Sequence, residues 1–228
     1  MGPHCVTLVP PIVIERFARR IPGLAALRGS LRRRFLGRGK PKSAETWDAQ
    51  YRAGRWDGLP GETQRHDVVA SLVRRFAPPR PLVLDVGCGQ GGLARRLRAC
   101  AGARYVGLDL SREAIARAAS DAAPAESFHA FDVESGAPPF VAERSVNAAV
   151  FSEVLYYLDD PLRTVDRFGP LLAPDGFFVL SLWKPSRHRA LLRRLCKGLV
   201  ETSSAEVGSG DTWRISVCVP RSRAAQPA

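Results

Sequence analysis

The sequence predicts an α/β fold in which a mainly parallel sheet is covered by helices on both faces. From residue 82 onward, short apolar segments typical of strands alternate with segments whose apolar residues recur at helical spacing. Three of the short segments end in an aspartate, and these aspartates are 24 and 23 residues apart, about one strand and one helix each. A chain of 228 residues with 45% apolar residues can bury one sizeable core.

The elements are expected in a regular order. A helix over residues 62–76 carries an apolar stripe and ends before two prolines. Ser111 is the expected N-cap of one later helix, and Asp160 with Pro161 opens another. The expected strands are 82–85, 104–108, 127–131, 146–151, 173–183 (with its turn), 199–202 and 213–219. The expected helices after the first are 91–101, 111–119, 160–172 and 187–197.

The positive charge is concentrated at the N-terminus. The whole chain carries a formal charge of +12, of which residues 1–42 contribute +9. These residues are expected to form a basic, partly disordered arm that could touch an anionic membrane surface or another polyanion. Residues 43–219 are expected to form one domain, and residues 220–228 a disordered tail. Because the domain itself is nearly neutral, DNA and RNA are disfavoured as partners.

Cysteine usage and hydropathy point to a cytoplasmic protein. The five cysteines are widely spread and include no C-x-x-C pair, so no disulfide or zinc signature is present and no bound metal is expected. No apolar run approaches the roughly 18 residues that a membrane span needs. The charges of the arm follow its apolar stretch instead of preceding it, which is the reverse of a secretion signal.

The glycine-rich stretch "LVLDVGCGQGG" (residues 82–92) allows two interpretations. Gly87, Gly89 and Gly92 have the G-x-G-x-x-G spacing of a turn that cradles a dinucleotide pyrophosphate. Asp85 stands two residues before the first glycine, where a carboxylate would oppose a pyrophosphate. The same carboxylate suits a cationic group, such as the amino acid end of S-adenosylmethionine (SAM). Asp109 would fit the ribose hydroxyls of either cofactor.

Five motifs in order resemble those of the class I SAM-dependent methyltransferases, in particular of the group that acts on small molecules. They are "VLDVGCGQGGLA", "YVGLDLS", "FHAFDVES", "VNAAVFSEVLYYLDDP" and "LLAPDGFFVLSLW", within roughly residues 47–219. The resemblance implies a Rossmann-like sheet of seven strands with the last strand antiparallel. It also implies SAM as the cofactor and S-adenosylhomocysteine (SAH) as its product.

The resemblance also implies a role for individual residues. It assigns the methionine end of SAM to Asp85, Gly87 and Gly89, and the ribose and adenine to Asp109 and Leu110. Asp132 and Val133 are also assigned to the adenine, and Phe151 and Ser152 to the floor below the methyl group. Trp47, Tyr51 and Trp56 loosely match the aromatic residues that related enzymes place over the methionyl part. Packing onto the domain explains these aromatic residues equally well.

The acceptor side is less defined. Glu153 and Tyr156 follow the fourth strand and are candidates for contact with the acceptor, although Glu153 could equally cap an element or face solvent. Tyr157 stands where many relatives carry a histidine, so a histidine base is not expected there. Without a large insertion, the expected reaction is methyl transfer to oxygen or nitrogen of a small molecule or an exposed sugar, amine or carboxylate. The alternative is a non-catalytic SAM-fold module that acts through the basic arm.

Overall fold

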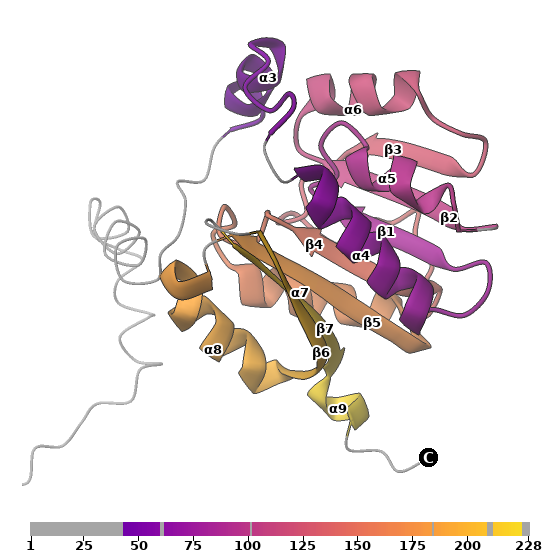
Figure 1. Cartoon of the computed structure of the whole chain (residues 1–228), viewed down its shortest axis with the longest axis vertical. Coiled ribbons are helices and arrows are strands. Elements are labelled where there is room, and N and C mark those ends of the chain that lie inside the picture. Colours follow the sequence, from indigo (N-terminus) through magenta and orange to yellow (C-terminus); the bar gives the residue numbers. More distant parts are fainter. Residues whose placement is uncertain (1–42, 60–61, 101, 184, 209–211, 225–228) are drawn as a thin grey trace, which may run out of the picture.

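The computed structural model describes residues 43–59, 62–100, 102–183, 185–208 and 212–224, so the expected basic arm of residues 1–42 lies outside the described residues. The described residues form one sheet with the strand order β3-β2-β1-β4-β5-β7-β6 (Figure 1). All neighbouring strands are parallel except for the pairs that β7 makes with β5 and β6. The predicted Rossmann-like fold, with seven strands and an antiparallel last strand, is therefore confirmed.

The observed elements follow the predicted order closely. The strands are β1 (Leu82–Val86), β2 (Arg104–Asp109), β3 (Glu126–Ala130), β4 (Val146–Ser152), β5 (Leu172–Trp183), β6 (Leu199–Val207) and β7 (Trp213–Pro220). The α-helices are α3 (Ala44–Arg52), α4 (Glu62–Phe76), α5 (Gly92–Leu97), α6 (Arg112–Ser120), α7 (Pro161–Phe168), α8 (Arg189–Gly198) and α9 (Arg221–Ala224). Two short 3-10 segments are η2 (Gly169–Leu171) and η3 (Pro185–His188).

Several element ends differ from the prediction, including the following three. Helix α5 stops at residue 97, whereas the apolar spacing predicted a helix to 101. Strand β6 continues to Val207 because it stays paired with β7 as far as Trp213. Residues 221–224 form the helical turn α9 where disorder was expected, because the Arg223 guanidinium donates to the backbone carbonyls of Ala173, Gly169 and Leu172.

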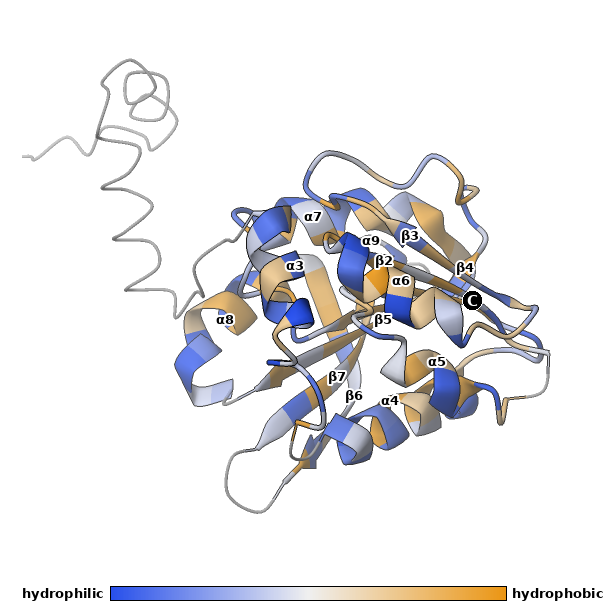
Figure 2. Ribbon diagram, turned by 90° about the horizontal axis from the view of Figure 1, so that it is seen from above, coloured by the Kyte–Doolittle hydropathy of each residue, from blue (hydrophilic) through white to orange (hydrophobic). Residues whose placement is uncertain are grey.

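Two apolar cores lie on opposite faces of the sheet, because alternate residues of each strand point to opposite faces. On one face Val83 and Val150 pack with residues of α4 and α5, such as Val69 and Leu93. On the other face the core includes Phe151 of β4 together with residues of α7 and α8. The outer sides of these helices are largely hydrophilic (Figure 2). None of the helices among the described residues is long and apolar enough to span a membrane.

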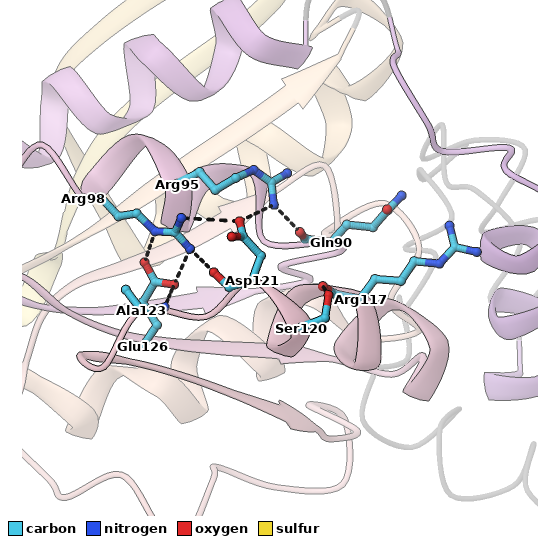
Figure 3. A network of polar contacts seen from close by, with 8 residues as sticks. All are labelled: Gln90, Arg95, Arg98, Arg117, Ser120, Asp121, Ala123 and Glu126. Atoms are coloured by element: carbon cyan, nitrogen blue, oxygen red, sulfur yellow. Dashed lines mark hydrogen bonds and ion pairs between the residues drawn. The ribbon is translucent and has the colours of Figure 1, made fainter.

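A polar network fixes α5 beside β3 (Figure 3). The Arg98 guanidinium donates to both carboxylate oxygens of Glu126, over 2.9 and 3.0 Å, and this pairing lowers the pKa of Glu126. Asp121 lies 3.3 Å from the same guanidinium. Arg95 donates to the carbonyl of Gln90 over 2.8 Å, so the same helix also holds the glycine-rich turn that precedes it.

Candidate active site

The predicted acidic strand ends meet at one edge of the sheet. Asp85 is the fourth residue of β1, the strand that lies between β2 and β4. Within the sheet, Asp85 pairs with Gly107 of β2 and with Val150 of β4. The chain moves to one side of β1 for β2 and β3 and to the other side for β4 and β5. Such a switch point, beyond the carboxyl ends of parallel strands, is where open α/β sheets bind their ligands.

The glycine-rich turn is shaped for close approach of a ligand. Gly87 and Gly89 have φ values of +76° and +54°, which side-chain-bearing residues rarely adopt. A Cβ atom at Gly87 would also lie 3.0 Å from the Cβ of Val154. Gly92 has a different role, because a Cβ there would lie 2.5 Å from Cε1 of His66 in α4. Gly92 therefore permits the contact between helices α4 and α5. This packing explains why a glycine stands at the third position of the dinucleotide spacing without invoking a pyrophosphate ligand.

Asp109 holds this turn from the end of β2. Its Oδ2 accepts a hydrogen bond from the backbone N–H of Gly89 over 2.9 Å, and its Oδ1 accepts one from Ser111 over 2.8 Å. Burial raises the pKa of Asp109, and these two hydrogen bonds act in the opposite direction. Each carboxylate oxygen keeps a second lone pair for a ligand hydroxyl.

Asp85 is the buried carboxylate of the site. It is only 2% exposed, and its Oδ2 accepts a hydrogen bond from the Tyr105 hydroxyl over 2.5 Å. Its Oδ1 is buried without a hydrogen-bond partner among the described residues. Burial raises the pKa of Asp85 to about 6, while the Tyr105 hydroxyl and the Arg65 charge lower it. An unsatisfied buried oxygen of this kind is costly unless a ligand pairs with it.

The structure adds one residue that the sequence analysis missed. Arg65, in the second turn of α4, is 7% exposed and donates a hydrogen bond to the Ser152 hydroxyl at the end of β4. Its second terminal nitrogen lies 3.2 Å from Nε2 of His66. A signal was present in the sequence, because Arg65 precedes Val69 by four residues and so continues the apolar stripe of its helix. A buried arginine at this edge can bind a carboxylate.

The predicted aromatic residues gather over the turn. The rings of Trp47 and Trp56 are 5.5 Å apart and those of Tyr51 and Trp56 6.3 Å apart. A Cβ at Gly89 would lie 3.1 Å from the Tyr51 hydroxyl oxygen, so Tyr51 contacts the turn. Helix α3 lies beside α6 (Figure 1), where Asp48 accepts hydrogen bonds from the Ser111 hydroxyl and from the backbone N–H of Glu113, over 2.6 and 3.1 Å.

Glu153 and Tyr156 contact each other beyond β4. The Tyr156 hydroxyl donates to Glu153 over 2.7 Å, and Glu153 also accepts from the Ser181 hydroxyl and the Trp183 backbone N–H. Burial raises the pKa of Glu153. Glu153 has a φ of +60°, a left-handed conformation that is found in non-glycine residues mostly where structure or function requires it. Of the alternatives considered, Glu153 therefore caps the end of β5 and does not face solvent.

A row of aromatic rings continues from this pair. Tyr156 stacks on His188, with 4.8 Å between ring centroids and 11° between planes. Tyr157 lies 4.7 Å from Tyr156 on one side and 5.0 Å from Trp47 on the other. The row therefore joins α3, the segment after β4 and the start of α8. It places apolar surface beside the strand ends, with Glu153 at its centre.

The remaining predicted residues lie at different depths. Asp132 is exposed just beyond β3, where its Oδ1 accepts from the Glu134 backbone N–H over 2.9 Å. Leu110 is half-buried after β2, and Val133 packs into the core on the α7 face. For Phe151 the expectation that its side chain lines the floor is wrong. Its ring is fully buried against Phe168 and Phe178, because alternation along β4 points Phe151 to the α7 face.

The described residues contain no group of three or more His, Cys, Asp or Glu side chains placed to hold a metal ion. The edge of the sheet offers one buried carboxylate, one buried guanidinium, the glycine turn and the aromatic row. Within this set, Asp85 Oδ1 is the buried polar atom without a hydrogen-bond partner among the described residues. The glycine turn leaves space that the Cβ atoms of larger residues would fill. These features fit a ligand with an amino acid end and a ribose.

Comparison with known proteins agrees with this geometry. The methyltransferase domain family matches residues 62–213. The ubiquinone biosynthesis O-methyltransferase of Paraburkholderia phymatum is 35% identical over 102 residues, which are 43% of this chain and 43% of that protein. The mitochondrial arginine-hydroxylase NDUFAF5 of Rattus norvegicus is 25% identical over 189 residues, 75% of this chain and 54% of that protein. The chain thus spans about half or less of the curated relatives it matches.

Solved structures share the fold. The N-methyltransferase NodS from Bradyrhizobium japonicum WM9, in complex with SAH, has a TM-score of 0.60 at 22% identity, over 73% of this chain and 91% of that chain. The [4+2]-cyclase SpnF has a TM-score of 0.64 at 16% identity, over 80% and 98%. With the family match covering most of the described residues, the chain belongs to the class I SAM-dependent methyltransferase family.

Proposed function

We propose that the chain transfers the methyl group of SAM to an oxygen or nitrogen atom of a small molecule or of an exposed sugar, amine or carboxylate group. The observation that carries this proposal is the buried Oδ1 of Asp85, which has no hydrogen-bond partner among the described residues and lies close to the buried guanidinium of Arg65. The amino acid end of SAM has one ammonium and one carboxylate, which match these two charges. When bound, SAM supplies a methyl carbon on a positively charged sulfur and leaves as SAH.

The nucleoside half of SAM is assigned to the neighbouring strand ends. Asp109 would accept hydrogen bonds from the ribose hydroxyls with the lone pairs that Gly89 and Ser111 leave free. Leu110 and Val133 would contact the adenine ring, and Asp132 would accept from its amino group. Gly87 and Gly89 would let the backbone approach the ligand without side-chain interference.

The aromatic residues of the N-terminal segment would cover the methionyl part. Asp48 fixes α3 to the start of α6, and this contact holds Trp47 and Tyr51 beside the glycine turn. An aromatic face within about 6 Å of the sulfonium would contribute roughly 0.5–2 kcal/mol by a cation–π interaction. The same cover would exclude water from the reacting atoms, which favours methyl transfer over hydrolysis.

The acceptor would lie against Tyr156 and Tyr157. Their rings, with those of His188 and Trp47, offer apolar faces that suit a flat or partly apolar acceptor. Tyr156 would orient the nucleophilic O–H or N–H group with its hydroxyl oxygen. Glu153, whose pKa burial raises, would take the Tyr156 proton as Tyr156 receives that of the acceptor. Positioning of the nucleophile in line with the sulfur–carbon bond would supply much of the remaining rate.

The relatives support both acceptor atoms. One is named as an O-methyltransferase of ubiquinone biosynthesis, and a structural neighbour of similar fold is named as the N1-methyltransferase of 1,6-didemethyltoxoflavin in Burkholderia thailandensis. The direct experiment incubates the chain with methyl-labelled SAM and separate pools of phenols, amines, sugars and carboxylates. Label is expected in one pool and is expected to fall with Tyr156→Phe. Absence of label in every pool, with SAH bound, would favour the non-catalytic alternative.

That alternative is a SAM-fold module that acts through the basic residues 1–42. SpnF has the same fold and is named as a cyclase, so the fold alone does not fix the reaction. Deletion of residues 1–42 separates the two functions, because the site is built from residues 47–188. We expect the shortened chain to keep its SAH affinity and its label transfer. Loss of label transfer with intact SAH binding would assign the arm to the acceptor.

A further inference from the structure

Asp85 is held by a second buried residue from the neighbouring strand. Tyr105 of β2 is 2% exposed, and its hydroxyl donates to Asp85 Oδ2 over 2.5 Å. Gly107, the residue that pairs with Asp85, has no side chain, and a Cβ there would lie 2.7 Å from Phe128 and 2.8 Å from Cys88. The space beside the carboxylate is therefore filled by side chains, and the phenol is the one hydrogen-bond donor that the described residues bring to Asp85.

The two oxygens of Asp85 thus differ. Oδ2 is occupied by Tyr105, and Oδ1 is buried without a partner among the described residues. A carboxylate with one oxygen anchored cannot rotate freely, so the direction of the other oxygen is fixed. This geometry prepares one acceptor for one incoming donor, which is the arrangement that a preorganised binding site requires.

We propose that Tyr105 is a positioning residue for cofactor binding: its hydroxyl fixes the orientation and the negative charge of Asp85, so that Oδ1 can accept the ammonium group of the methionyl end. The inference rests on the proposed function for the identity of the ligand. The effect on Asp85 itself does not depend on any ligand.

The charged groups around Asp85 show why the hydroxyl is needed. Burial and the nearby Asp109 carboxylate favour the protonated form of Asp85, and the Cys88 thiol in the following turn is itself buried beside both carboxylates. Among the residues that the structure describes, only the Tyr105 hydroxyl and the Arg65 guanidinium favour the ionised form of Asp85. Without the hydroxyl, Arg65 is the one group of these two that still lowers the pKa of Asp85, while burial and repulsion from Asp109 raise it. Asp85 would therefore become protonated closer to neutral pH.

The test measures Asp85 directly and without ligand. Carbon-13 NMR of the Asp85 side-chain carboxyl, assigned with Asp85→Asn, follows its titration in the unmodified chain and in Tyr105→Phe. We expect the pKa of Asp85 in Tyr105→Phe to be higher by at least about one unit, because the ionised carboxylate loses its charge-assisted hydrogen bond. The matched control is Phe128→Leu, which changes the ring beside Tyr105 without removing a hydroxyl. An equal pKa in Tyr105→Phe and the unmodified chain overturns the proposal.

SAH calorimetry between pH 5.5 and 8.5 provides the second readout. The affinity of Tyr105→Phe is expected to fall at least about threefold below that of the unmodified chain near pH 6.5, because a one-unit rise from a pKa of about 6 lowers the ionised fraction of Asp85 by that factor, and to approach it at pH 8.5. A constant ratio across this range would mean that Tyr105 acts only on packing. If the unmodified chain binds no SAH, the proposed function fails, whereas the NMR titration still decides whether Tyr105 controls Asp85.

A second substitution keeps the proposal testable if Tyr105→Phe does not fold. Replacement of the four tyrosines by 3-fluorotyrosine retains every hydroxyl and makes each a stronger donor. The pKa of Asp85 is then expected to fall, opposite to the effect of Tyr105→Phe. An unchanged or higher pKa of Asp85 in the fluorinated protein would contradict the inference.

Discussion

Arg65 donates a hydrogen bond to the Ser152 hydroxyl and so joins helix α4 to the end of strand β4 across 87 residues of sequence. The bond brings a buried positive charge to the edge where Asp85 supplies a buried carboxylate. An amino acid group carries both opposite charges, and a nucleoside carries neither. In the proposed function, the pair would therefore distinguish the methionyl end of SAM from the rest of the cofactor.

Replacement of Arg65 by methionine is expected to weaken SAH binding at least tenfold. The physical reason is the loss of a charge-assisted hydrogen bond to the ligand carboxylate, typically about 1.5–3 kcal/mol. The affinity for 5′-methylthioadenosine, which lacks the amino acid end, should change little. Calorimetry with both ligands checks the prediction, and Arg74→Met, an exposed position on the same helix, is the control. An equal loss for both ligands would assign Arg65 to the general packing of the site.

Removal of the Asp109 carboxylate is expected to weaken SAM binding by at least about 1.5 kcal/mol, roughly tenfold. Asp109→Ala removes the proposed acceptor for the ribose hydroxyls and also the hydrogen bonds that Asp109 accepts from the Gly89 and Ser111 backbone N–H groups. The exposed Asp67, which pairs with Arg96 on the surface, provides the control substitution Asp67→Ala. A dissociation constant unchanged by Asp109→Ala would refute the role of this carboxylate.

Addition of one methyl group at Gly92 is expected to destabilise the fold by about 1–3 kcal/mol, the usual cost of overpacking. The new Cβ would lie 2.5 Å from Cε1 of His66. Urea unfolding of Gly92→Ala measures the loss, and Gly136→Ala, where a Cβ meets nothing within 4 Å, is the matched control. Much of the lost stability should return in a His66→Ala background. The same cost with and without His66 would show that the contact is not the cause.

The pH dependence of the free energy of unfolding should reveal the cost of ionising the buried Asp85 carboxyl group. Its folded pKa of about 6 lies above the ordinary 3.8, so the folded state binds this proton more tightly than the unfolded state. The unmodified chain should therefore lose stability relative to Asp85→Asn as the pH rises from about 4 to 7. Because each pKa unit is worth about 1.4 kcal/mol, the relative loss can reach about 3 kcal/mol. Denaturant titrations of both proteins at several pH values measure it, and a constant difference would contradict the assignment.

Much of the fold and half of the site could be predicted from local patterns. Strand ends are visible because apolar runs stop at polar residues, and parallel strands bring those ends to one edge. This logic placed Asp85 and Asp109 at the glycine turn, where the structure has them. The antiparallel last strand was implied by the family resemblance and not by residue spacing, since strand direction depends on the connection.

The misses have physical causes. Arg65 lies in a helix before the first strand, and its contact with Ser152 is a long-range one that no local spacing encodes. The resemblance assigned Phe151 to the floor together with Ser152, but alternation along β4 turns the Phe151 ring into the core. Tyr105 reads as an ordinary buried strand residue, and only the three-dimensional pairing of β1 with β2 shows its hydrogen bond to Asp85.

The most direct test of the central claim is the titration of the unmodified chain with SAH by calorimetry near pH 7.5. We expect saturable binding of one SAH per chain at micromolar ligand, with 5′-methylthioadenosine binding more weakly because it has no amino acid end to pair with Asp85 and Arg65. Absence of binding at high micromolar SAH would contradict the assignment of this sheet edge to SAM.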